Sequence, residues 1–159
     1  MTVFVTLTEV EKSWVVQWAT AIYEASKEQN LVDVKMDASA DSLQMDIVGF
    51  GGELAFAKMA NQFPLTDTDG PTRVDCVING KSVDIKTTNL ASGRLLVRPA
   101  HKLKPADAYV LITGSMDEGY TYRGWATAEQ IFADENLTDL GHGPTYALTQ
   151  GELRGGLPQ

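Results

Sequence analysis

Two aspartates and a lysine near the middle of the chain carry side chains that could perform metal-dependent chemistry. Asp75 and Asp84 lie in two short β-rich runs, and only Asn79 and Gly80 separate these runs. An Asn-Gly pair in this setting is the strongest short-range signal for a two-residue type I′ hairpin turn. In the register that such a turn imposes, Asp75 lies directly opposite Asp84. Lys86 shares their face of the hairpin because it follows Asp84 by two residues.

A pair of facing carboxylates is unstable without a partner and therefore points to a bound cation. Directly opposite Cβ atoms are about 4.5–5.5 Å apart, and like charges at that separation repel. Hard ions such as Mg²⁺ bind oxygen ligands and are commonly held by one or two carboxylates together with phosphate and water. A lysine beside such a site can orient or deprotonate a water, or stabilise charge that develops on a phosphate.

The order Asp75, then Asp84-Ile85-Lys86, resembles the signature of the PD-(D/E)XK nuclease superfamily and of its small phage-type members. Glu53 matches the glutamate that many members carry on the preceding helix. The resemblance covers about residues 50–113, in the order helix, hairpin, connection and buried strand. It implies a restriction-endonuclease-like fold of the α/β (α+β) class, with a mixed central sheet flanked by helices and the Asn-Gly hairpin carrying the active site.

The same resemblance implies a deoxyribonuclease that depends on Mg²⁺ or Mn²⁺ and hydrolyses phosphodiester bonds, as an endonuclease. Its implied catalytic residues are Glu53, Asp75, Asp84 and Lys86. Asp75, Asp84, Glu53 and the backbone carbonyl of Ile85 are the implied metal ligands, and Lys86 positions or activates the attacking water. The sequence departs from the commoner pattern in three respects: Val74 precedes Asp75, an aspartate stands at position 84, and the spacing of nine between the two aspartates is short.

Three alternatives remain open at the level of the sequence. The hairpin face could be solvated, with Arg73, Lys86 or protonation relieving the repulsion between the aspartates. The chain could be a catalytically inactive nuclease-fold module that binds nucleic acid or protein, of an anti-defence or DNA-mimic type. It could also be a junction resolvase, which would act as a dimer on four-way junctions.

The charge distribution along the chain favours a nucleic-acid partner although the total charge does not. The formal net charge is -8, and a basic excess is the usual footprint of DNA binding. Residues 81–104, however, carry six Lys and Arg against one Asp, a local net of +5. This stretch could contact phosphates beside the scissile bond, unless its side chains are ordinary surface residues of a loop. The candidates for phosphate contact are Arg94, Arg98, His101, Lys102 and Lys104.

Periodicity predicts the elements that position this site within one domain over residues 1–159. Thr8 and Glu11 form a capping box before an amphipathic helix at about 9–29. A second helix at about 44–62 contains three glycines, so either it begins near Gly51 or a close backbone approach requires them. We expect the core at 44–134 and a mobile, turn-rich C-terminal tail. Strands are predicted near 32–36, 73–78, 81–86, 94–98, 108–113 and 120–125, with a loop at 63–72 and a short helix after Thr127.

Composition excludes several classes of protein. Apolar residues make up 43% and charged residues 21%, which is ordinary for a chain that buries a core. The single Cys76 excludes a disulfide scaffold, and no apolar run approaches the ~18 residues of a membrane span. The N-terminus lacks the basic region of a secretory signal. We therefore expect a cytoplasmic protein, in the host cytoplasm if a phage encodes it, whose partner is DNA rather than membrane. A homodimer is favoured, because small nucleases often need a second copy to cover DNA.

Overall fold

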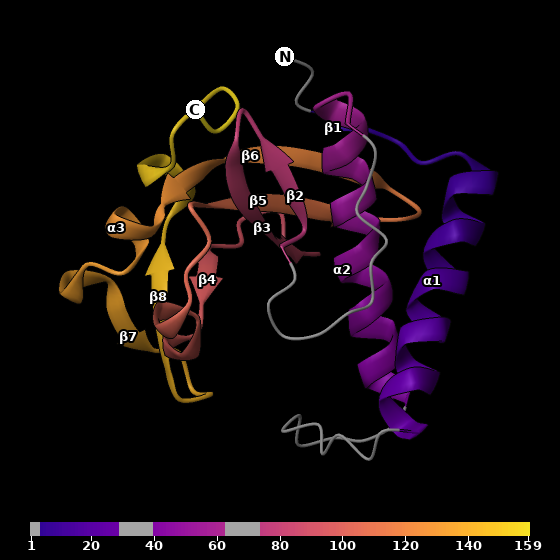
Figure 1. Cartoon of the computed structure of the whole chain (residues 1–159), viewed down its shortest axis with the longest axis horizontal. Coiled ribbons are helices and arrows are strands. Elements are labelled where there is room, and N and C mark those ends of the chain that lie inside the picture. Colours follow the sequence, from indigo (N-terminus) through magenta and orange to yellow (C-terminus); the bar gives the residue numbers. More distant parts are fainter. Residues whose placement is uncertain (1–3, 29–39, 63–73) are drawn as a thin grey trace.

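A curled, five-stranded mixed sheet runs through the centre of the protein (Figure 1). The computed structural model describes residues 4–28, 40–62 and 74–159; the predicted strand at 32–36, the loop at 63–72 and Arg73 lie outside them. The strand order is β1-β6-β5-β3-β2, with β3 and β5 parallel and the other neighbours antiparallel. The predicted α+β class, a mixed sheet flanked by helices, is thus confirmed. These strands are β1 (Phe4–Val5), β2 (Cys76–Ile78), β3 (Lys81–Thr88), β5 (Ala108–Ser115) and β6 (Gly119–Thr127).

Two long helices cover one face of this sheet, where α2 (Ala40–Met59) packs on the strands and α1 (Glu9–Glu28) packs on α2 (Figure 1). The predicted capping box begins α1. The Thr8 amide donates to Glu11 Oε2 at 2.7 Å, and the Glu11 amide donates to Thr8 Oγ1 at 3.2 Å. Glu11 Oε2 also lies 2.8 Å from Nζ of Lys58, so an ion pair ties the start of α1 to the end of α2.

The glycines of α2 allow the helix to lie unusually close to the sheet. A Cβ atom on Gly51 would overlap the hydroxyl of Tyr120 on β6, and one on Gly52 would overlap the side chain of Thr87 on β3. At Gly49, no described residue beyond its neighbours in the helix has an atom within 4 Å of the Cβ position. The helix begins before all three glycines, at Ala40, so close packing rather than a late helix start explains this part of the sequence.

A second, three-stranded sheet of order β4-β8-β7 covers the opposite face of the central sheet (Figure 1). Alternate residues of β5 show this: Val110 and Ile112 belong to the core beneath the helices, whereas Tyr109 and Leu111 pack with β4 and β8. Strands β7 and β8 are not predicted from the sequence, because β7 is short and largely exposed and turn residues separate the two. The remaining elements are β4 (Leu95–Val97), η1 (Pro99–Leu103), α3 (Ala128–Ile131), η2 (Asp134–Asn136), β7 (Leu137–Asp139), β8 (Pro144–Leu148) and η3 (Gln150–Glu152).

The C-terminal segment is anchored to the sheet, contrary to the mobile tail expected from its turn-rich sequence. Its backbone pairs with β6 through two hydrogen bonds between Trp125 and Arg154, at 3.0 and 2.8 Å. Tyr122 Oη donates to the Gly156 carbonyl at 2.6 Å, and Asn79 Nδ2 donates to the Pro158 carbonyl at 3.0 Å. The tail therefore connects β6 with the turn between β2 and β3. Among the residues that the structure describes, no helix has the length and apolar content that crossing a membrane requires.

Candidate functional site

The turn between β2 and β3 has the backbone that its sequence predicts. Asn79 and Gly80 have φ values of 50° and 76°, and a type I′ turn needs positive φ at both of its central residues. The strand pairs nearest the turn follow the predicted register, because local chemistry is sufficient to set it. These pairs are Ile78 with Lys81, Val77 with Ser82, and Cys76 with Val83.

Asp75 departs from the predicted register and is not the cross-strand partner of Asp84. Its amide donates to the carbonyl of Val83 at 3.1 Å, although Val83 is already paired with Cys76. Two residues against one is the pattern of a β-bulge. The Asp75 carboxylate then takes the place of a backbone acceptor, since its Oδ2 accepts a hydrogen bond from the Ile85 amide at 2.6 Å. Asp75 thus holds the strand that carries Asp84 and Lys86.

Asp84 and Lys86 form an ion pair on the face of β3 turned toward the second sheet. They alternate with the buried residues Val83 and Ile85, so their side chains leave the strand on the opposite side. Lys86 Nζ lies 2.7 Å from Asp84 Oδ1. The two groups are not aligned for a hydrogen bond, and among the described residues this buried Oδ1 has no hydrogen-bond partner.

His101 of η1 completes this group. Its Nδ1 lies 3.5 Å from Asp84 Oδ2. Partial burial lowers the pKa of His101 below its usual 6.5, and the positive charges of Lys86 and Arg98 lower it further, against the opposite effect of the Asp84 carboxylate. The imidazole is therefore mainly neutral at pH 7, and it can donate to Asp84 or to a bound ligand through one ring nitrogen.

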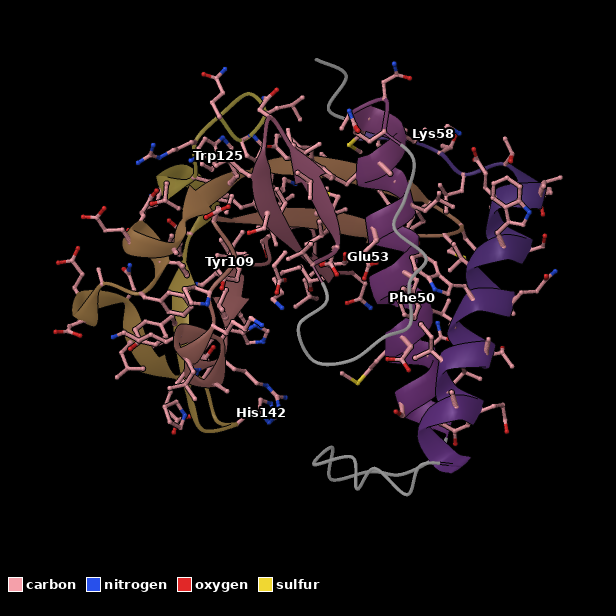
Figure 2. All side chains as sticks on the ribbon, in the orientation of Figure 1. Phe50, Glu53, Lys58, Tyr109, Trp125 and His142 are labelled. Carbon is pink, nitrogen blue, oxygen red and sulfur yellow. The ribbon has the colours of Figure 1, made fainter. Side chains whose placement is uncertain are left out.

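Glu53 approaches from the helical side of the sheet. It lies on α2 directly after Gly52, whose backbone is packed on β3, and Figure 2 shows it on the side of α2 that faces the strands. Burial raises the pKa of the Cys76 thiol to about 12, with further contributions from the negative charges of Asp75 and Glu53. Both carboxylates are therefore near Cys76, which is a buried residue and not a nucleophile.

Asp75 and Glu53 both lie near Cys76, whereas Asp84 projects from the other face of β3, so the predicted acidic residues do not make a formed metal cage. Within residues 4–28, 40–62 and 74–159, no group of three or more His, Cys, Asp or Glu side chains is arranged to hold a metal ion. The hydrogen bond from Ile85 engages Asp75, and the Lys86 ammonium engages Asp84. A cation at this place would therefore require these side chains to exchange partners.

The basic residues predicted to contact DNA lie on the connection between the parallel strands β3 and β5. His101 lies against Asp84, and Arg98 is close enough to lower the pKa of His101. Lys102 is directed elsewhere, with Nζ 5.5 Å from the centre of the Tyr146 ring. Arg94, Arg98 and Lys104 are exposed. The connection thus places basic side chains near Asp84, in agreement with the positive local charge of this stretch.

An open cleft of about 380 Å³ adjoins Lys86. Leu90, Leu96 and Leu140 line it together with Arg94, and the buried Leu111 is also part of its wall. The sequence analysis does not single out these leucines. One local signal exists, because alternation along β4 buries Leu95 and Val97 and directs Leu96 outward. Leu140 carries no such signal, since only the fold brings it to Lys86.

Comparison with protein-family models, with curated proteins and with solved structures finds no significant match to this chain.

Proposed function

We propose that this protein is a DNA endonuclease that depends on Mg²⁺ or Mn²⁺ and hydrolyses phosphodiester bonds, with a PD-(D/E)XK type of site. The observation that carries the proposal is the pairing of Asp84 with Lys86 on β3, beside Asp75 and beneath a cationic connection. A structural ion pair alone does not account for the accompanying basic surface. A site that must bind a phosphate and activate a water accounts for both.

The residues present fit a hard divalent cation. Asp84 Oδ1 is a buried carboxylate oxygen without a hydrogen bond among the described residues, and oxygen donors are those that Mg²⁺ and Mn²⁺ prefer. Asp75, Asp84 and the Ile85 carbonyl would hold the ion, and Glu53, on the helical side near Asp75, would bind a second ion or a water. When bound, the ion would neutralise charge on the phosphate and lower the pKa of a water molecule.

The protein's own side chains would position the attacking water and bind the phosphates. The Lys86 ammonium, placed beside Asp84, would orient the attacking water and stabilise the charge that develops on the phosphate. The water oxygen bonds to phosphorus and loses a proton to solvent, one P–O ester bond breaks, and the leaving oxygen takes up a proton from solvent. Arg94 and Arg98 would bind phosphates on either side of the cleaved one. Asp75 would keep the backbone of Ile85 in position through its 2.6 Å hydrogen bond.

Cleavage of plasmid and single-stranded DNA, with Mg²⁺ or Mn²⁺ and with EDTA, tests the proposal. We expect metal-dependent cleavage that falls by about 100-fold or more in Lys86→Met, because the loss of one group that stabilises developing charge commonly costs this much. Lys81→Met is the matched control, since Lys81 is an exposed lysine at the other end of β3. DNA binding by a folded protein that cleaves none of these substrates would reject the nuclease in favour of a binding module.

A further inference from the structure

We infer that the cleft beside Lys86 binds one unpaired nucleotide of a DNA strand, adjacent to the phosphate that is cleaved. The inference rests on the proposed nuclease function and adds the class of substrate to it. DNA with an unpaired nucleotide at the cleavage site would be preferred over fully paired duplex.

Three leucines in the walls of the cleft are exposed to solvent and so do not contribute to the buried core. Leu90, Leu96 and Leu140 are 64%, 41% and 47% exposed, and all three line this one cleft. They come from the loop after β3, from β4 and from the turn between β7 and β8. Exposed apolar side chains that gather around a hollow are typical of a ligand site. A nucleobase is a flat, largely apolar surface that such walls can hold.

The charges at the cleft select an anion. Lys86 and Arg94 are its charged lining residues, and none of the carboxylates that the structure describes lines it. Ser92 and Thr88 add hydroxyl groups. A ligand with an apolar ring and an adjacent negative charge satisfies both parts of the lining, and a nucleotide is such a ligand. The volume of about 380 Å³ lies in the range of small-molecule sites and is far too small for a duplex.

One wall of the cleft is held in place before any ligand binds. Gln150 Nε2 donates to the carbonyls of Ala91 and Gly93 at 2.8 and 2.9 Å. Within the loop, the Gly93 amide donates to the Leu90 carbonyl at 2.8 Å. A Cβ atom on Gly93 would overlap Thr88, so the loop can lie this close only with glycine there. A preformed wall lowers the entropic cost of binding a ligand.

Fluorescence anisotropy with a labelled oligothymidylate in EDTA measures occupancy of the cleft without cleavage. We expect Leu140→Ala to weaken binding about tenfold, because it removes one apolar wall. Leu137→Ala is the matched control, since Leu137 is 48% exposed on neighbouring β7 and does not line the cleft. In Mg²⁺, we expect the wild type to cleave a duplex with one unpaired nucleotide faster than the fully paired duplex. Leu140→Ala should lose most of this preference.

The outcomes separate the two proposals. Equal affinity of the wild type and Leu140→Ala for oligothymidylate would overturn the proposal that the cleft binds a nucleotide. The proposal would also be overturned if an active wild-type enzyme cleaved the paired duplex and the duplex with one unpaired nucleotide equally fast. In both cases metal-dependent cleavage would still support the nuclease. Conversely, Leu140-dependent binding without any cleavage would support the nucleotide cleft and reject the nuclease.

Discussion

Lys86 Nζ lies 2.7 Å from Asp84 Oδ1, and the two side chains project from the same face of β3. This ion pair is the centre of the candidate site, because His101 lies beside Asp84 and the leucine-lined cleft adjoins Lys86. Removing either partner tests a different part of the proposal, because only the carboxylate could bind a cation.

Asp84→Ala should abolish metal binding together with cleavage. We expect the heat of Mn²⁺ binding in calorimetry to disappear and the cleavage rate to fall at least about 100-fold, since a carboxylate ligand of the cation is lost. Asp117→Ala is the control, because Asp117 is an exposed aspartate outside the candidate site. Unchanged Mn²⁺ binding in Asp84→Ala would remove Asp84 from the set of metal ligands.

Asp75 should prove important for stability as well as for activity. Asp75→Ala leaves the amide of the buried Ile85 without the acceptor it now has at 2.6 Å. We expect the free energy of unfolding to fall by about 1–3 kcal/mol. Asp75→Asn keeps an acceptor oxygen and should lose less stability, while still losing a metal ligand. Urea denaturation measures the stability of both variants. Equal stability of the wild type and Asp75→Ala would show that the hydrogen bond from Ile85 to Asp75 does not stabilise the protein.

The glycines of α2 should respond differently to the same substitution. Gly52→Ala places a methyl group on the Thr87 side chain, so we expect a loss of about 1–3 kcal/mol in the free energy of unfolding. Gly49→Ala meets no described residue outside its own helix within 4 Å and should stabilise the protein by up to about 1 kcal/mol, because alanine is the better helix former. Thermal denaturation of the two variants side by side is the measurement. Similar melting temperatures would refute the close approach of α2 to β3.

Gln150 should affect substrate binding without touching the reacting atoms. Gln150→Ala removes both hydrogen bonds that hold the loop carbonyls of Ala91 and Gly93. We expect weaker binding of oligothymidylate, by about three- to tenfold, because the cleft wall must then be ordered on binding. At saturating DNA the cleavage rate should stay close to that of the wild type. A loss of kcat with unchanged affinity would show that Gln150 acts elsewhere.

Stability should decline in alkaline solution. Burial raises the pKa of Cys76 from 9.0 to about 12 and that of Tyr120 from 10.0 to about 12. Above pH 9 the unfolded chain therefore loses protons that the native protein keeps. The free energy of unfolding should then fall as the pH rises toward 12, and the contribution of these groups should be complete below pH 9.

Urea titrations at pH 8, 9 and 10 measure this decline. Cys76→Ala should make the loss between pH 9 and 10 smaller, since the thiol begins to ionise in the unfolded chain before the tyrosines do. An equal pH dependence in the variant would show that other groups cause the decline.

The local chemistry of the sequence was sufficient for several features. The Asn79-Gly80 pair and the alternating residues around it specify the turn and the three strand pairs beside it. A two-residue loop allows only one register of the two strands. Thr8 and Glu11 specify the start of α1 for the same reason, since all interacting groups lie within one turn of helix. The order of Glu53, Asp75, Asp84 and Lys86 likewise predicted the location of a candidate site.

Tertiary structure alone decided how these residues meet. The alternation predicts that Asp75 faces Asp84, but its carboxylate accepts the Ile85 hydrogen bond, because the pairing of β2 with β3 begins only at Cys76. The glycines of α2 acquire their meaning only from Thr87 and Tyr120 on distant strands. The cleft joins Lys86 with Leu140, more than fifty positions further along the chain. No local pattern encodes this arrangement, since the packing of the second sheet against β3 and β5 creates it.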